Sequence, residues 1–211
     1  MKKYLILVLL IVPCLALSSL DIGIGANVSF LLETEKEDSS SAYSLDTLLV
    51  PSLHLMISPQ IEILPFIGIG FSKESDPDAI STAGWRADYS QLMISAGAGF
   101  FYHFINREIV SLSTGPRLAL FLNLAPSGTS ATVYDSYFNL VTRVGLPIYL
   151  DVQLKQRLFL RTGIEVFGVE FDFWKQEEAG VTSSGTTFAI KDYILDPLGS
   201  FQGWVGFIYM L

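Results

Sequence analysis

The chain has 211 residues, with little cysteine, little charge and no long apolar run beyond its first twenty residues. Its single cysteine, Cys14, lies near the start, so the remaining chain can form neither a disulfide nor a thiolate metal site. Charged residues make up 16% of the chain, whereas soluble domains average about 25%. After residue 20 no stretch approaches the roughly 18 apolar residues that a membrane-spanning helix needs. These absences argue against a disulfide scaffold, a zinc-cysteine site and a helical membrane protein.

Basic residues are also scarce, because the formal net charge is −8. A protein that binds nucleic acid needs a basic face to neutralise phosphates. We therefore expect no nucleic-acid partner, and the charge is compatible with an exported protein whose loops face water.

The first residues have the pattern of an export signal. Lys2 and Lys3 form a basic start, residues 4–15 are apolar, and Ala16 and Ser18 give small residues before a cleavage site. A lipoprotein leader using Cys14 or a retained helix are the alternatives, but Pro13 and the short apolar segment fit them poorly. We predict a signal peptide over residues 1–18 and a mature domain over residues 19–211.

The mature chain is rich in apolar residues that alternate with polar or small ones. Over residues 20–32 the even positions are apolar, from Ile22 to Leu32, and the odd positions include Asp21, Gly23 and Asn27. A period of two indicates a strand whose two faces meet different environments. The same alternation predicts eight strands near residues 20–32, 45–57, 61–69, 92–104, 110–120, 138–148, 158–166 and 201–211.

The connections between these strands alternate between long and short. The long ones cover residues 33–44, 72–88, 123–136 and 169–194; the short ones cover 58–60, 106–108 and 151–156. Transmembrane barrels have short periplasmic turns and longer extracellular loops. The sequence therefore predicts an all-β fold, a transmembrane up-and-down antiparallel β-barrel of about eight strands, with both ends of the mature chain in the periplasm.

A soluble β-sandwich also alternates, with a core face and a wet face. Here the polar faces carry many glycines, such as Gly68, Gly70, Gly97 and Gly99, and few lysines or glutamates. Such residues suit a narrow enclosed lumen. Aromatic residues also gather near both predicted ends of the apolar face, as in the two aromatic girdles of a membrane barrel. Pro51, Pro65 and Pro116 fall within predicted strands, and each removes a ladder donor, so they are expected to mark bulges or strand ends.

The last residues resemble the assembly signal of bacterial outer-membrane proteins. Gly206, Tyr209 and Leu211 match its glycine and its apolar or aromatic third-last and last positions, whereas Trp204 stands where a polar residue is common. The mature chain as a whole resembles the small eight-stranded outer-membrane family of OmpA and OmpX type barrels. This resemblance implies location in the bacterial outer membrane, contact with outer-membrane lipids, and recognition of the last strand by the outer-membrane assembly machinery.

The inward faces carry a few ionisable residues. Arg117, Arg143, Arg161 and Glu165 are predicted on neighbouring strands, near mid-height of the lumen. Unpaired charges there would be costly, so we expect an ion-pair cluster, either a structural plug or a gate.

His54 and His103 are predicted to face inward near the periplasmic rim, where Glu62 could join them in a polar cluster. A zinc site is the less favoured interpretation of two histidines so far apart in sequence, and we expect no cofactor. The sequence contains no recognisable catalytic constellation, so we expect that the protein is not an enzyme.

Three functional hypotheses follow from this architecture. The first is a structural or surface-interaction protein that meets an extracellular ligand through its loops, since loops on rigid scaffolds often carry function. The second is a narrow channel or transport protein. The third, least favoured, is a lipid-modifying enzyme of the outer membrane, which would need a serine activated by histidine within reach of lipid.

Overall fold

The computed structural model describes residues 20–37, 40–75, 88–125, 136–178, 181–192 and 200–211, which form one antiparallel β-sheet. Its strands are β1 (Asp21–Glu37), β2 (Ser40–Ser58), β3 (Ile61–Ser75), β4 (Asp88–Asn106), β5 (Val110–Thr114), β6 (Arg117–Ala125), β7 (Ser136–Lys155), β8 (Leu158–Glu178), β9 (Val181–Asp192) and β10 (Ser200–Met210). The predicted signal peptide, residues 1–18, lies outside the described residues. In the described part of the chain no helix is long and apolar enough to cross a membrane.

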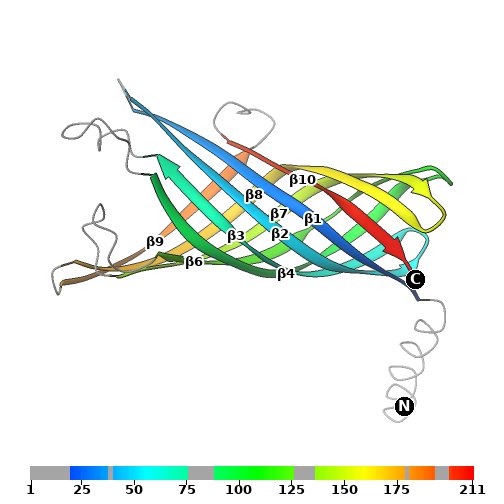
Figure 1. The fold of residues 1–211 in the computed structure, drawn as a ribbon, viewed down its shortest axis with the longest axis horizontal. Helices are drawn as coiled ribbons and strands as arrows, with labels where there is room; N and C mark the ends of the chain where they lie inside the picture. The colour runs from blue at the N-terminus through cyan, green and yellow to red at the C-terminus, as the bar shows by residue number, and fades with distance from the viewer. Residues whose placement is uncertain (1–19, 38–39, 76–87, 126–135, 179–180, 193–199) are drawn as a thin grey trace, which may run out of the picture.

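The sheet closes on itself (Figure 1). Strands β1 to β4 pair in chain order, β5 and β6 both lie between β4 and β7, and β10 lies between β8 and β1. Strands β5 and β6 therefore share one position in the ring, separated at Gly115 and Pro116, where proline interrupts the ladder as expected. Strands β10 and β9 pair with the lower and upper parts of β8 in turn and also share one position. The result is an up-and-down barrel of eight positions, which confirms the predicted fold class.

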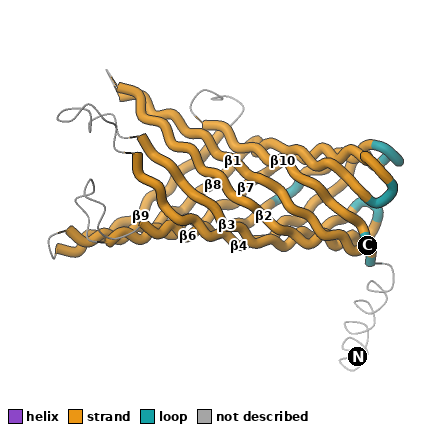
Figure 2. The backbone as a smooth tube through the Cα atoms, in the orientation of Figure 1, coloured by secondary structure: helices purple, strands orange, loops and turns teal. Residues whose placement is uncertain are grey.

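The tight connections lie together at one end of the barrel, beside the C-terminus (Figure 2). The backbone N–H of Met210 donates to the carbonyl of Arg157 in the β7–β8 turn, and that of Leu211 donates to Ile22, both at 2.8 Å. We call this the short-turn end. The turn itself is shorter than the predicted 151–156, because β7 continues through Asp151 to Lys155.

At the opposite end two of the predicted long loops are largely strand. The predicted loop 33–44 is replaced by the ends of β1 and β2, and the predicted loop 169–194 by a hairpin of β8 and β9. For residues 169–194 the sequence pattern fails because β8 bulges: Pro147 pairs with Glu165 but Leu146 pairs with Phe167, so Val166 is an extra residue. A bulge shifts the alternation by one position, so outward residues change from even to odd numbers above it.

The outward face of the barrel is apolar. Ile67 and Phe71 of β3 are 64% and 63% exposed, which is unusual for such side chains. Exposed aromatic residues lie toward both ends of the strands: Phe100, Tyr102, Phe104 and Tyr209 near the short-turn end, and Phe71, Phe138, Phe171, Phe173 and Phe188 toward the other. Most strands have 15 to 21 residues, whereas about 9–11 suffice to span a bilayer, so the barrel extends beyond its apolar band.

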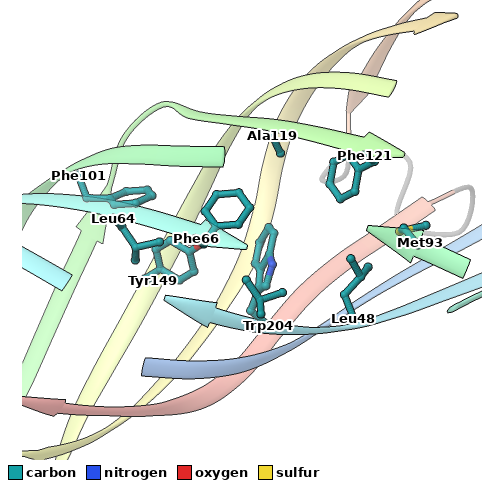
Figure 3. Close-up of a cluster of buried hydrophobic side chains, with 10 residues drawn as sticks. Leu48, Leu64, Phe66, Met93, Phe101, Ala119, Phe121, Tyr149 and Trp204 are labelled. Atoms are coloured by element: carbon teal, nitrogen blue, oxygen red, sulfur yellow. The ribbon is translucent and has the colours of Figure 1, made fainter. Parts of the chain in front are cut away.

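The inward face is not polar throughout. A buried apolar and aromatic cluster fills the middle of the lumen (Figure 3); its members are Leu48, Val50, Leu64, Phe66, Met93, Phe101, Ala119, Phe121, Tyr149 and Trp204. The sequence predicts a lumen filled by the polar and small residues of the alternation, and this apolar and aromatic centre corrects that expectation. These residues stand at inward positions of the alternation, and an eight-stranded barrel is just wide enough for side chains to fill it.

Candidate functional site

Below the apolar cluster, at the short-turn end, buried and half-buried polar side chains from six strands meet inside the lumen. We call this group the Glu62 network, and its members are Ser52 and His54 of β2, Glu62 of β3, His103 of β4, Ser111 of β5, Asp151 of β7 and Arg161 of β8. Each stands at an inward position of its strand, and neighbouring strands place them at one level. The barrel thus brings together residues up to 109 positions apart, from Ser52 to Arg161.

Arg161 lies at the centre of this network and is fully enclosed. Its Nε and Nη2 atoms donate to the two carboxylate oxygens of Asp151 at 2.6 and 2.8 Å. Its Nη1 and Nη2 atoms donate to the two carboxylate oxygens of Glu62 at 3.1 and 2.9 Å. The guanidinium carbon also lies 4.8 Å from the ring centre of Tyr149. One arginine therefore pairs with two buried carboxylates by paired, directional hydrogen bonds, the strongest type available to it.

Glu62 is completely buried and holds two histidines in addition to Arg161. One carboxylate oxygen accepts from His54 Nδ1, and the other lies 3.0 Å from His103 Nε2. The outer nitrogen of each ring faces a serine: His54 Nε2 lies 3.0 Å from Ser52 Oγ, and His103 Nδ1 lies 2.6 Å from Ser111 Oγ. A continuous series of hydrogen bonds therefore runs from one serine to the other through the carboxylate.

A cavity of about 250 Å³ lies against this network. Its lining combines the network with the apolar side chains of Met56, Phe159, Ile208 and Met210. Asp21, Pro59 and Asn106 complete the lining and are exposed at the short-turn end. The cavity therefore opens toward that end.

Above the cavity the lumen is closed by packed aromatic rings. The guanidinium of Arg117 lies between Phe66 and Trp204, at 4.4 and 4.8 Å from their ring centres. Tyr149 packs against Trp204 with ring centres 5.6 Å apart. We call these four side chains the plug. The cavity that they line holds only about 10 Å³, roughly the space of one water molecule.

A second charged layer lies beyond the plug. Arg143 pairs with Glu170 and donates to the side-chain oxygen of Gln202. Glu165 is buried, and neither of its carboxylate oxygens has a hydrogen-bond partner among the described residues. The charges of Arg117 and Arg143 act on it. Its carboxylate rests on Gly145, where any Cβ would overlap it.

The predicted ion-pair cluster is therefore distributed over two levels. All four predicted residues, Arg117, Arg143, Arg161 and Glu165, are buried in the lumen. Arg161, however, binds Asp151 and Glu62 near the short-turn end, while the other three lie at and above the plug. This differs from a single cluster at mid-height, because each strand is staggered relative to the next in a tilted barrel.

Sequence reasoning missed Asp151, Glu170 and the serine contacts of the two histidines. The sequence pattern places Asp151 in a turn, although it continues the odd-numbered inward series of β7. Glu170 lies beyond the β8 bulge, where the inward positions change from odd to even residue numbers. Nothing in the sequence pattern marks that change. The contact between His54, His103 and Glu62, by contrast, is predicted from the sequence and present in the structure.

The three residues of the predicted assembly signal lie on β10 and at its end. Gly206 faces inward, and a Cβ there would overlap the backbone of Ala26 and the side chain of Asn27. Tyr209 and Leu211 point outward and are exposed. Their recognition by an assembly machinery stays a prediction.

Within the part of the chain that the structure describes, no group of three or more His, Cys, Asp or Glu side chains is arranged to hold a metal ion. In the Glu62 network the ring nitrogens and the carboxylate bind one another, the serines and Arg161 instead.

Comparison with known proteins supports the fold. No protein-family model and no curated protein sequence matches the chain. The outer membrane protein OprG from Pseudomonas aeruginosa is similar in structure, with a TM-score of 0.55 at 10% identity, over 91% of this chain and 95% of that chain. The outer membrane protein AlkL is less similar, with a TM-score of 0.49 at 15% identity, over 90% of each chain. A major outer membrane protein of Thermus thermophilus has a TM-score of 0.44 at 13% identity, over 92% of this chain and 100% of that chain. The chain thus has the fold of a small outer-membrane β-barrel.

Proposed function

We propose that the protein is an integral bacterial outer-membrane β-barrel with a closed lumen, acting at the cell surface through the strands and loops opposite the short-turn end. The observation that carries this proposal is the combination of an apolar outer face with a plug of four packed side chains. The apolar face fits hydrocarbon, because lipid-facing residues of such barrels alternate with lumen residues. The plug narrows the free space at its level to a cavity of about 10 Å³, which supports a closed lumen.

In this proposal both ends of the mature chain lie in the periplasm, with the short-turn end. The extended hairpins of β1–β2 and β8–β9 then rise above the outer leaflet. The β8–β9 hairpin pairs continuously from Phe167↔Asp192 to Glu178↔Val181, so it can present a stable surface to an extracellular ligand. Contact with outer-membrane lipids and recognition of Gly206, Tyr209 and Leu211 by the assembly machinery belong to the same proposal.

Conductance in planar lipid bilayers tests the closed lumen. Purified protein should give no steady, defined conductance, because the plug seals the barrel. A reproducible ion-selective conductance would overturn the proposal in favour of a narrow channel. The Arg143→Ala variant is the control that would assign such a conductance to the lumen, since it should alter or abolish the selectivity.

A further inference from the structure

Ser111 has the hydrogen-bond surroundings of an activated nucleophile. Its Oγ lies 2.6 Å from His103 Nδ1, and His103 Nε2 lies 3.0 Å from Glu62 Oε2. A serine, a histidine and a carboxylate joined in this order are the parts that nucleophilic catalysis by serine requires. The three residues come from β5, β4 and β3, which are neighbours in the barrel wall.

The Glu62 carboxylate fixes which proton His103 carries. A carboxylate can only accept, so neutral His103 has its proton on Nε2 and leaves Nδ1 free to accept from Ser111. Arg161 and His54 hold the same carboxylate from other sides, so Glu62 cannot turn away. The histidine is thereby oriented as a base toward the serine hydroxyl.

Ser111 is also accessible, unlike the other serine of the network. It is half-buried and lines the 250 Å³ cavity that opens at the short-turn end. Ser52 is buried, does not line that cavity, and is engaged by Asn27 Nδ2 at 3.3 Å. Of these two serine–histidine pairs, only the pair of Ser111 and His103 can meet a molecule from outside.

Asn106 supplies a donor beside Ser111. The two residues are opposite partners on β4 and β5 and both line the cavity; opposite residues of an antiparallel pair have their side chains on one face. The amide nitrogen of Asn106 gives one hydrogen to the carbonyl of Pro59 at 2.6 Å. Its second hydrogen is available to an oxyanion at the reacting carbon, the role that side-chain amides have in acyl transfer.

We propose that Ser111, His103 and Glu62 form a hydrolytic site for small carboxylic esters that enter at the short-turn end. The four apolar side chains of the cavity provide a surface for an acyl or alkyl group. The volume lies near the lower end of ligand pockets, which span about 300–1,000 Å³, so the substrate is small. This departs from the expectation, drawn from the sequence, that the protein is not an enzyme, and it is independent of the surface role proposed above.

The proposed reaction has two steps. His103 takes the hydroxyl proton as Ser111 Oγ bonds to the ester carbon; the ester C–O bond then breaks, and the leaving alkoxide receives that proton as an alcohol. A water molecule next attacks the acyl-serine, giving its proton to His103, and the carboxylic acid leaves as Ser111 regains a proton. Water is the only co-reactant.

Labelling with a fluorescent fluorophosphonate tests the nucleophile in the full-length protein folded in detergent. We expect the probe to label Ser111, as located by mass spectrometry, and the protein to hydrolyse p-nitrophenyl acetate. Ser111→Ala should abolish labelling, and His103→Asn should lower hydrolysis about 100-fold or more. The matched control is Ser113→Ala, two residues along the same strand, whose buried hydroxyl lies outside the cavity; it should label like the wild type.

A thiol in place of the hydroxyl gives a second readout that does not depend on the unknown substrate. In a Cys14→Ser background, the Ser111→Cys variant should react with iodoacetamide faster than a Ser58→Cys variant at the half-buried end of β2, because His103 takes the thiol proton. Absence of labelling at Ser111 in heat-modifiable, folded wild-type protein, or an unreactive thiol at 111, would overturn the proposal. Neither result bears on conductance, so failure here is distinguishable from failure of the closed-barrel proposal.

Discussion

Replacing Arg161 by methionine should be among the most damaging single changes in the barrel. The substitution keeps much of the side-chain length but removes the only arginine that binds Asp151 and Glu62 among the described residues. Both carboxylates would then face each other without a counterion in an enclosed space. Their remaining partners, the histidines on Glu62, cannot replace a guanidinium that makes two paired contacts.

The magnitude follows from the type of interaction. Breaking a buried ion pair by removing one partner costs about 3–5 kcal/mol, because the other charge is left uncompensated. Here two carboxylates lose the same partner, so we expect the upper part of that range. Neutralising both as well, in a triple variant with Glu62→Gln and Asp151→Asn, should recover part of the loss, since the uncompensated charges disappear.

The assay is urea unfolding of the protein refolded in phospholipid vesicles, followed by tryptophan fluorescence and by gel mobility without boiling. Arg107→Met is the matched control, because Arg107 is exposed in the β4–β5 turn; it should change the free energy of unfolding by less than about 0.5 kcal/mol. A loss below about 1 kcal/mol for Arg161→Met, or an equal loss for the control, would show that the network is not a buried ion-pair site.

Three further predictions concern packing and the outer face. Trp204→Ala should lower the free energy of unfolding by about 3–5 kcal/mol, because it leaves a cavity in the plug. The control Val205→Ala, at an outward position, should lower it clearly less. Equal losses in urea unfolding would contradict the tight packing of the plug. Gly145→Ala should destabilise by about 1–3 kcal/mol, since its methyl group would meet the Glu165 carboxylate; an unchanged urea midpoint would argue against that contact. Ile67→Arg, midway along the exposed apolar face of β3, should cost about 2–4 kcal/mol in vesicles, and a neutral effect would place that face in water.

The barrel itself could be predicted from the sequence because lipid and lumen impose opposite requirements on alternate residues. That requirement acts on each strand separately. The alternation in strands such as β1 and β4 can therefore be recognised without knowing which strands lie beside them. The closing pair of β1 and β10 could also be expected, because a membrane sheet with open edges would leave backbone groups unpaired in hydrocarbon.

The heights at which inward residues meet could not be predicted, because they depend on strand stagger and on bulges. One extra residue at Val166 reverses the faces of β8 above it, which hid Glu170 inside an apparent loop. Arg161 and Glu165 share β8, but four residues of extended strand span about 13 Å, so the two side chains reach different levels of the lumen. Periodicity identifies which residues face inward, and only the register shows which of them touch.

The aromatic interior shows a different limit of sequence reading. Phe66, Tyr149 and Trp204 occupy inward positions of the same alternation as the polar residues. The sequence predicts a lumen filled by polar and charged side chains, whereas bulky aromatic and apolar side chains fill the centre of the narrow ring. Counting side-chain volume on the inward face, in addition to polarity, would have indicated the plug.

Gel migration of the protein extracted from outer membranes tests the central claim, that the apolar outer face of this closed barrel contacts lipid. We predict that detergent is needed for extraction and that unboiled and boiled samples migrate at different positions, because the barrel stays folded until heated. A polypeptide that is monodisperse in plain buffer, with one position before and after boiling, would contradict it.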